Sequence, residues 1–244
     1  MSTYTNRIFT KYISHENVLT IFELGSRDLI DGIAMLHEYS NTNKLYSFEC
    51  NPVCIEKCNK LYNTLTDIVK DKVNIIPKAV SLENGKIAFM SVDEKTMDNC
   101  GASSIYEIDF SNRTDNDPDK NRSSVQKQIS VDAIRLDTFC NNNNITNIDL
   151  IAMDLQGYEL NALKSLGLLL KNVKYIITET CIESTYKGGC NFKELYELLS
   201  QNGFKYIVSD RYGNNIPPDN IKGWSEFNCL FINSNFNTTL KFTQ

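Results

Sequence analysis

The chain has 244 residues, of which 41% are hydrophobic and 23% are charged, a composition typical of a folded globular protein and not of a disordered one. The formal net charge of −5 excludes a broad basic surface, so we expect no nucleic-acid partner. At the start of the chain, residues 1–17 contain no apolar signal-peptide core, and no run reaches the roughly 18 apolar residues that cross a bilayer. We therefore expect a cytoplasmic protein without a membrane span, whose eight cysteines are reduced.

In the first third of the chain, short apolar runs alternate with amphipathic stretches. The runs predict buried strands at residues 18–22, 45–48 and 73–76. The stretches between them predict helices over residues 28–39 and 52–69. Pro52 suits the first turn of the second helix. Asn84 and Gly85 then predict a turn that joins two extended segments, residues 79–80 and 87–89.

The rest of the chain continues the alternation after a polar stretch, residues 111–124, which predicts an inserted surface loop. Further strands are predicted at residues 129–134, 148–153, 173–178, 204–208 and 227–232. Helices are predicted over residues 158–170 and 192–201. Residues 210–224 have a turn-like sequence without a helical pattern, so the last two strands are expected to form an antiparallel hairpin.

Strands that alternate with helices predict right-handed βαβ units and a mainly parallel sheet, hence an α/β fold. No internal repeat or composition break divides the chain, so we expect a single domain over residues 18–244, preceded by an N-terminal extension of residues 1–17. Ligands of such sheets bind beyond the carboxyl ends of the strands. The candidate functional residues are therefore those that directly follow each strand.

Acidic residues follow several of the predicted strands: Glu23, Glu49, Asp154 and Glu179. A carboxylate beside an apolar strand is costly unless it meets a ligand or a hydrogen-bond donor. Gly25 would let a ligand approach the backbone closely, and an acid at position 49 suits the paired hydroxyls of an adenosine ribose. A structural glycine and a capping acid are the alternative interpretation. The spacing of the glycines does not match the G-x-G-x-x-G fingerprint of dinucleotide-binding proteins.

Three segments, taken in this order, resemble the FkbM family of S-adenosylmethionine-dependent methyltransferases. They are residues 22–28 (FELGSRD), 48–52 (FECNP) and 148–159 (IDLIAMDLQGYE). Further support comes from residues 79–81 with Asn84 and Gly85, from Ser103 and Ser104, and from residues 136–139. The resemblance extends over about residues 18–231, nearly the whole chain.

The resemblance implies a Rossmann-like methyltransferase fold, with a mainly parallel seven-stranded sheet, helices on both faces and an antiparallel last strand. It also implies S-adenosylmethionine as the cofactor. The turn formed by Glu23, Gly25 and Ser26 would hold its methionine part. Glu49 would bind the ribose hydroxyls. The remaining cofactor-binding residues would be Asn51, Ala79, Val80, Ser81 and Asp154, with the segment from 79 to 81 close to the adenine and Asp154 facing the reaction centre.

The sequence departs from the family pattern at three positions. Leu29 stands where a second glycine is common. The usual D-x-E-G-x-E carries Gln156 at its third position, which removes a charge and keeps a hydrogen-bonding amide. Ala152 stands where a lysine is common. Cofactor binding is still expected, and the catalytic arrangement is the part of the site that these changes affect.

Methyl transfer from a sulfonium to a hydroxyl needs alignment and removal of the acceptor's proton. Asp154 is the first candidate for the catalytic base and Glu179 the second. His15, in the N-terminal extension, is a weaker candidate for a residue that caps the site, and Tyr186 could stack on a sugar or anchor its loop. Cys50, Cys54 and Cys58 have helical spacing but no fourth ligand nearby, so no metal is expected.

The leading hypothesis is an O-methyltransferase that acts on a hydroxyl of a saccharide or a related small polyol, and this acceptor class comes from the resemblance. One alternative is a degenerate cofactor-binding protein with an interaction role, suggested by Gln156 and Ala152. Another is a nicotinamide-dependent sugar dehydrogenase. The absence of G-x-G-x-x-G and of a Tyr-x-x-x-Lys pair argues against the latter. A homo-oligomer is left open.

Overall fold

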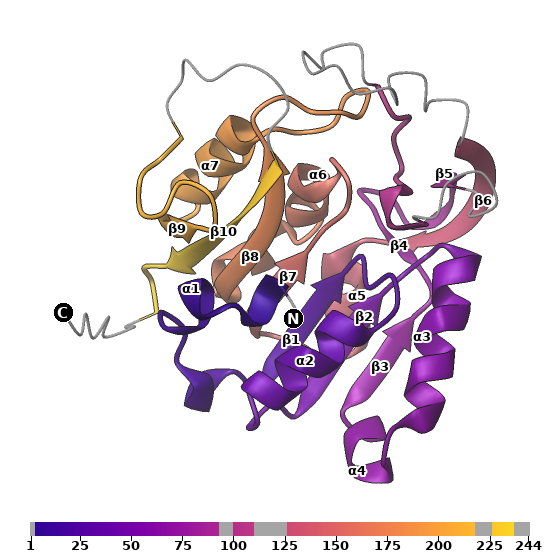
Figure 1. Ribbon diagram of the computed structural model, residues 1–244, viewed down its shortest axis with the longest axis horizontal. Helices are drawn as coiled ribbons and strands as arrows, with labels where there is room; N and C mark the ends of the chain where they lie inside the picture. The colour runs from indigo at the N-terminus through magenta and orange to yellow at the C-terminus, as the bar shows by residue number, and fades with distance from the viewer. Residues whose placement is uncertain (1–2, 93–99, 110–125, 218–225, 237–244) are drawn as a thin grey trace.

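A seven-stranded sheet organises the computed structural model, which describes residues 3–92, 100–109, 126–217 and 226–236 (Figure 1). The strand order is β3-β2-β1-β7-β8-β10-β9. The strands are β1 (Thr20–Leu24), β2 (Lys44–Phe48), β3 (Val73–Ile76), β7 (Ile148–Met153), β8 (Val173–Cys181), β9 (Phe204–Ser209) and β10 (Glu226–Asn233). Only β10 runs antiparallel to its neighbours, β8 and β9. The predicted Rossmann-like sheet and its antiparallel last strand are therefore confirmed.

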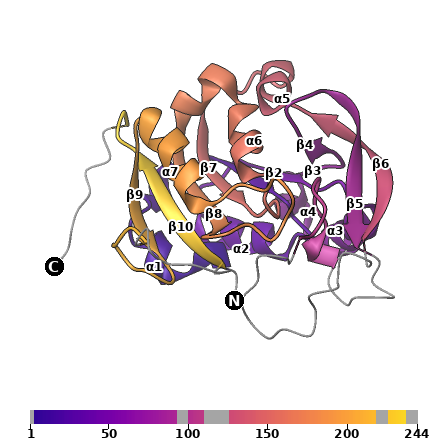
Figure 2. The same cartoon turned by 90° about the horizontal axis from the view of Figure 1, so that it is seen from above.

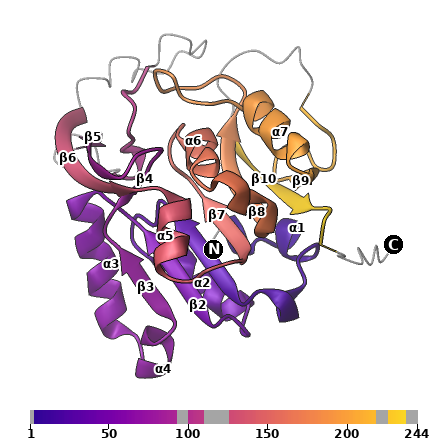
Figure 3. The ribbon, with the colours of Figure 1, turned by 180° about the vertical axis from the view of Figure 1, so that it is seen from behind.

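Helices cover both faces of this sheet, as Figure 2 shows from above. One face, turned toward the viewer in Figure 1, carries α1 (Arg7–Thr10), α2 (Ile30–Glu38) and α3 (Pro52–Thr64). The other carries α5 (Leu136–Asn142), α6 (Glu159–Lys164) and α7 (Phe192–Gln201), which Figure 3 shows from behind. The two faces alternate along each strand: Ile21 packs with α2, whereas Phe22 packs with α5.

A second, three-stranded sheet lies beside the main one, and the sequence did not predict its pairing. It contains β4 (Ala79–Val80), β5 (Gly85–Val92) and β6 (Gln126–Ile134). The segments on either side of Asn84 do not pair with each other, because β6 lies between them, parallel to β4 and antiparallel to β5. This arrangement holds Ala79 and Val80 beside the end of β3. The predicted polar loop, residues 111–124, lies outside the described residues.

Two predicted helices are interrupted. The helix predicted over residues 52–69 ends at Thr64, because Leu65 and Thr66 are extended before the short α4 (Asp67–Lys70). The helix predicted over residues 158–170 stops after α6, where Gly167 takes a left-handed φ of 55° and a 3₁₀ helix (Gly167–Asn172) follows. Strand β1 begins two residues later than predicted, where the carboxylate of Asp149 accepts the N–H groups of residues 19 and 20.

The N-terminal segment packs onto the same face as α2. It contains α1 between two 3₁₀ turns, Thr3–Thr5 and His15–Asn17. Phe9 and Ile13 are buried in the apolar cluster that α2 shares with the sheet. This packing brings the first residues of the chain to the carboxyl edge of the strands, where Tyr4 takes part in the site described next.

Candidate functional site

A cavity of about 480 Å³ opens at the carboxyl edge of the main sheet, between the loops that follow β1, β2, β7 and β8. Most of the residues selected from the sequence line it: Gly25, Ser26, Glu49, Ala79, Val80, Asp154 and Glu179. Three others lie behind its wall: Glu23, Asn51 and Ser81. The rule that ligand-binding residues follow the strands therefore identified one continuous surface.

The turn after β1 is shaped by contact with the turn after β7. Gly25 has a φ of 85°, and a Cβ on it would lie 2.0 Å from the carbonyl oxygen of Asp154. The N–H groups of Gly25 and Ser26 both donate to the carbonyl of Phe48, at 3.0 Å each. The neighbouring backbone therefore requires glycine at this position, which agrees with the alternative interpretation of a structural glycine.

Leu29 occupies the position where the family pattern has a second glycine. Its φ of 70° is left-handed, which is the conformation that favours glycine. This conformation costs a leucine about 1–2 kcal/mol. Its side chain is fully buried in the apolar cluster under α2, so burial offsets the strain. Ala152, the third departure, is fully buried and does not line the cavity.

Glu23 supports the β1 turn from below. Its Oε2 accepts hydrogen bonds from the hydroxyls of Ser26 at 2.7 Å and Ser47 at 2.5 Å. Its Oε1 is buried, with no hydrogen-bond partner in the described structure. Burial raises the pKa of this carboxyl to about 7, against the lowering effect of the two hydroxyls. Glu23 thus reaches the cavity only through Ser26.

Glu49 follows β2 and faces the cavity while its carboxylate accepts from three backbone N–H groups. Its Oε1 accepts from Cys50 at 2.8 Å and Asn51 at 2.7 Å, and its Oε2 accepts from Arg27 at 2.8 Å. Burial raises the pKa of Glu49, and the three N–H groups oppose that rise. A carboxylate has about four acceptor positions. One position on Oε2 is therefore left to point at a ligand.

Asn51 and Ser81 fix neighbouring segments. Asn51 caps α3 by accepting from the N–H of Val53, and its Nδ2 donates to the hydroxyl of Ser103 at 3.0 Å. The hydroxyl of Ser81 lies 3.5 Å from that of Tyr158, whose ring lines the cavity. Both residues support cavity walls that other residues form.

A hydrogen-bonded network lies where the β7 and β8 loops meet. The side-chain amide of Gln156 donates to Asp154 Oδ1 at 2.6 Å and to Glu179 Oε2 at 3.1 Å. Its Oε1 accepts from the hydroxyl of Tyr186 at 2.5 Å. The two carboxyl groups also interact with each other, and each changes the pKa of the other. Gln156 has a left-handed φ of 52°, so its backbone is held in this turn against its preference.

Burial and like charge shift both carboxyl groups. Burial, reinforced by the charge of Asp154, raises the pKa of Glu179. Burial also raises the pKa of Asp154, while its hydrogen bond from Gln156 lowers it. Two buried carboxyl groups that interact do not both ionise readily, so the pair retains a proton more strongly than an isolated carboxyl does.

Several cavity residues were not predicted from the sequence, among them Tyr4 and Glu226. Tyr4 reaches the cavity from the N-terminal segment, and only tertiary packing places it there. His15, the residue suggested from that segment, instead lies against Tyr39 and within 3.6 Å of Glu38. Glu226 opens β10 and lines the cavity. Because β10 runs antiparallel to the other strands of the main sheet, its first residue lies at their carboxyl edge. The predicted antiparallel hairpin could therefore have indicated Glu226 as a cavity residue.

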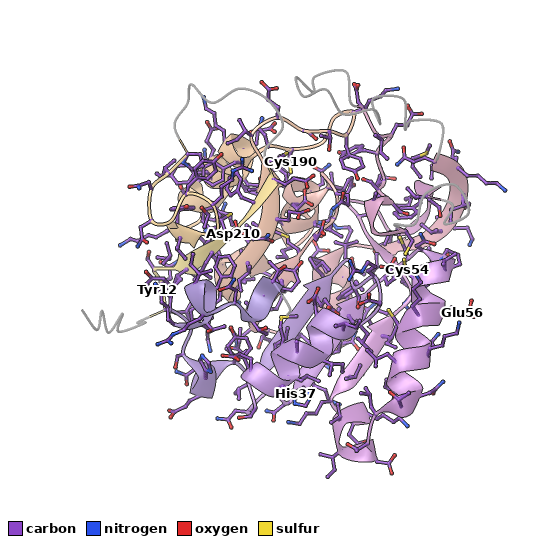
Figure 4. The ribbon with its side chains drawn as sticks, in the orientation of Figure 1. Tyr12, His37, Cys54, Glu56, Cys190 and Asp210 are labelled. Atoms are coloured by element: carbon purple, nitrogen blue, oxygen red, sulfur yellow. The ribbon has the colours of Figure 1, made fainter. Side chains whose placement is uncertain are left out.

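The three cysteines with helical spacing are buried, and Figure 4 shows Cys54 on the inner side of α3, with Glu56 on the outer side. The sulfur of Cys54 lies 3.0 Å from that of Cys100, which lines the cavity. The part of the chain that the structure describes contains no group of three or more possible metal ligands. Within the same residues, no helix combines the length and the apolar character that crossing a bilayer requires.

Comparisons with known proteins agree with this architecture. The family model described as the methyltransferase FkbM domain matches residues 26–206. A curated relative, 2-O-methyltransferase NoeI of Sinorhizobium fredii, is 27% identical over 184 residues, which cover 73% of this chain and 70% of the relative.

Among solved structures, a proposed tRNA (m1A22) methyltransferase from Streptococcus pneumoniae matches with a TM-score of 0.50 and 11% identity, over 96% of this chain and 70% of that one. This likeness concerns the fold alone. The methyltransferase FkbM from Methylobacillus flagellatus matches with a TM-score of 0.46 and 10% identity, over 88% of this chain. The chain spans 43% of the length of that structure.

Proposed function

Because this chain belongs to the FkbM family of S-adenosylmethionine-dependent methyltransferases, we propose that it transfers the methyl group to a hydroxyl oxygen of a saccharide or a related small polyol. The name of the curated relative supports transfer to oxygen. The saccharide class rests on the family resemblance. The proposal also includes a cytoplasmic location and no nucleic-acid partner. It leaves open whether the protein forms a homo-oligomer.

The cavity fits S-adenosylmethionine by the chemistry of its lining. Glu49 has an acceptor position left on Oε2, which suits a ribose hydroxyl. Ala79, Val80 and Phe89 offer an apolar surface for an adenine. Ser26 and Asp31 line the wall next to the β1 turn, where a methionine part with its ammonium group would be held. When bound, the cofactor supplies a methyl group that its sulfonium has already activated.

The protein's own part in the reaction is the removal of a proton. Asp154 lines the cavity, and as a carboxylate it can accept the proton of the acceptor hydroxyl. In this proposal Glu179 keeps the proton that the pair retains and donates a hydrogen bond that holds the Asp154 carboxylate in place. The observation that carries the proposal is this pair of buried carboxyl groups, joined through the amide of Gln156 on the cavity wall.

A labelled transfer reaction tests the proposal. The protein would be incubated with S-adenosylmethionine carrying a ¹³C methyl group and with a panel of neutral saccharides and polyols, and the products would be analysed by NMR. An O-methyl signal on one acceptor class is the expected result. Tight cofactor binding without transfer to any hydroxyl would instead favour the degenerate cofactor-binding protein, and an N-methyl or C-methyl product would contradict transfer to oxygen.

A further inference from the structure

The amide of Gln156 joins three separate parts of the reaction end of the cavity. It lies in the turn after β7, and it contacts Asp154 of the same turn, Glu179 in β8 and Tyr186 in the loop that follows β8. All four residues line the cavity. The resemblance to the family implies glutamate as the usual residue at this position, and this chain carries an amide there.

The backbone around Gln156 is fixed from both sides. The hydroxyl of Ser104 donates to the carbonyl of Gln156 at 2.8 Å. The buried carboxylate of Glu159 accepts from the N–H groups of Leu155 at 2.7 Å and Gly157 at 3.2 Å. A non-glycine residue stays left-handed only where its surroundings determine the conformation. These contacts therefore aim the side chain at the two carboxyl groups.

The shortest hydrogen bonds favour one orientation of the amide. Burial raises the pKa of Tyr186 well above its ordinary value, so its hydroxyl stays a donor. This hydroxyl lies 2.5 Å from the amide oxygen and 3.1 Å from the carbonyl oxygen of Ala102, so Gln156 is its closer acceptor. With the amide oxygen assigned to Tyr186, both amide N–H bonds point at the carboxyl groups. Asp154 Oδ1 and Glu179 Oε2 are therefore acceptors and carry no proton. The proton that the pair retains then lies on one of the two remaining oxygens. The bond to Asp154, at 2.6 Å, is shorter than the bond to Glu179, at 3.1 Å, so the amide stabilises the negative charge more on Asp154.

We propose that Gln156 is a positioning residue whose two N–H groups keep the retained proton of the carboxyl pair on Glu179 and leave Asp154 ionised toward the cavity. This inference rests on the proposed function, because an ionised Asp154 matters only if it accepts the acceptor's proton. Glutamate at position 156 would have no N–H to donate and would add a third carboxyl group. The amide thus supplies two N–H donors, which a glutamate side chain lacks.

Two kinds of variant test this role. Gln156→Met keeps the length of the side chain and removes its hydrogen bonds, and Gln156→Glu restores the family residue. Tyr186→Phe removes the donor that orients the amide and leaves the amide itself in place. Tyr106→Phe is the matched control, because the Tyr106 hydroxyl bonds Asn161 at 2.8 Å, outside the network.

The readout is a ¹³C NMR titration of the side-chain carboxyl groups in the protein alone, followed by the pH dependence of kcat. In the wild type we expect Asp154 to titrate far below Glu179. Gln156→Met should raise the titration midpoint of Asp154 by at least about 1 pH unit and move the acidic limb of the kcat profile by the same amount. Gln156→Glu should shift the Asp154 midpoint and the acidic limb of the kcat profile further than Gln156→Met does. Tyr186→Phe should shift these two quantities less, and Tyr106→Phe should leave them unchanged.

A lower kcat with an unchanged Asp154 midpoint and an unchanged pH profile in Gln156→Met would mean a purely structural role and would overturn the proposal. If Gln156→Met does not fold, unchanged midpoints in Tyr186→Phe and Gln156→Glu overturn it equally. The NMR titration needs neither cofactor nor acceptor. The two proposals can therefore fail separately. Absence of methyl transfer would contradict the proposed function, whereas an unchanged titration midpoint of Asp154 in the variants would contradict the role of Gln156.

Discussion

Neighbouring groups, more than residue type, determine how each acidic side chain of this protein behaves. The pKa of Asp137 is lowered, first by its hydrogen bond from Arg135. The carboxyls of Glu23 and Glu159 are buried without a cationic partner among the described residues, and burial raises the pKa of each to about 7. The pKa of Glu179, which is buried beside another carboxyl group, is raised further still.

The role of Asp154 predicts an asymmetry between two conservative substitutions. Asp154→Asn removes the group that accepts the proton, so turnover should fall by roughly 10²–10⁴. Glu179→Gln replaces the carboxyl that the proposal keeps protonated, so turnover should change by less than about tenfold. Steady-state kinetics on one verified acceptor, with cofactor affinity measured alongside, make the comparison. If Glu179→Gln is the more damaging of the two, Glu179 is the base.

The raised pKa values also predict how stability depends on pH. Glu23 and Glu159 keep a proton in the folded state up to about pH 7, whereas the unfolded chain loses it near 4.5. The folded state binds more protons between these values, so the free energy of unfolding must fall as pH rises through that window. Each group accounts for roughly 3 kcal/mol.

Urea unfolding at pH 5 and pH 8 measures this difference for the wild type and for Glu23→Gln. The variant carries no titrating group at position 23, so the fall in stability between the two pH values should shrink by roughly 3 kcal/mol. An equal fall in both proteins would show that Glu23 ionises in the folded state as readily as in the unfolded one.

At the scale of elements, the site depends on how closely the β1 and β7 turns approach each other. Gly25→Ala would place a Cβ 2.0 Å from the carbonyl oxygen of Asp154, which neither turn can accommodate without moving. We expect the free energy of unfolding to fall by at least about 3 kcal/mol, and cofactor binding to weaken because the turns separate.

Gly213→Ala is the control for the backbone conformation alone. Gly213 is also left-handed, with a φ of 59°, and a Cβ added to it would meet no atom within 4 Å. Its substitution should cost only about 1–2 kcal/mol. Equal losses in chemical denaturation of the two variants would show that the contact with Asp154 is not what requires glycine at position 25.

Buried strands were predictable because each is a short apolar run, and all seven strands of the main sheet coincide with predicted ones. The pattern is less informative where local contacts end an element. Helix α5 follows β6 after a single residue and was missed, because its seven residues are too few to show a helical period. The pairing of β5 with β6 was not predictable, because it depends on a partner about 40 residues away.

The candidate site was predictable to the extent that its residues adjoin strands. Glu49, Asp154 and Glu179 were found because one topological rule places them at one edge. The same rule selected Glu23, which contacts Ser26 and Ser47 behind the cavity wall, because β1 extends two residues further than predicted and Glu23 lies within it. Tyr4 was missed because nothing in its local sequence indicates its packing.

At the scale of the whole molecule, the N-terminal segment completes both the core and the cavity. The separation of residues 1–17 from the domain that follows is still a prediction. Phe9 is fully buried, Ile13 is buried, and Tyr4 lines the cavity. Deletion of residues 1–14 should therefore lower the free energy of unfolding by at least about 3 kcal/mol and weaken cofactor binding.

Thermal and urea unfolding of the truncated chain measure that loss, and Tyr4→Phe separates the two effects because it retains the buried segment. If the truncated chain is as stable as the full chain, residues 1–14 are an independent extension. If it is less stable but binds the cofactor unchanged, the segment belongs to the core and not to the site.

The central claim is that the cavity at the carboxyl edge holds S-adenosylmethionine with Glu49 at its ribose. Isothermal titration calorimetry of the wild type and Glu49→Gln, with S-adenosylmethionine, S-adenosylhomocysteine and NAD, tests it most directly. We predict that the wild type binds the first two and not NAD. Loss of a charge-assisted hydrogen bond of about 1.5–3 kcal/mol should weaken binding roughly 10- to 150-fold in a folded Glu49→Gln. Binding of NAD, or equal cofactor affinity in the two proteins, would contradict the account.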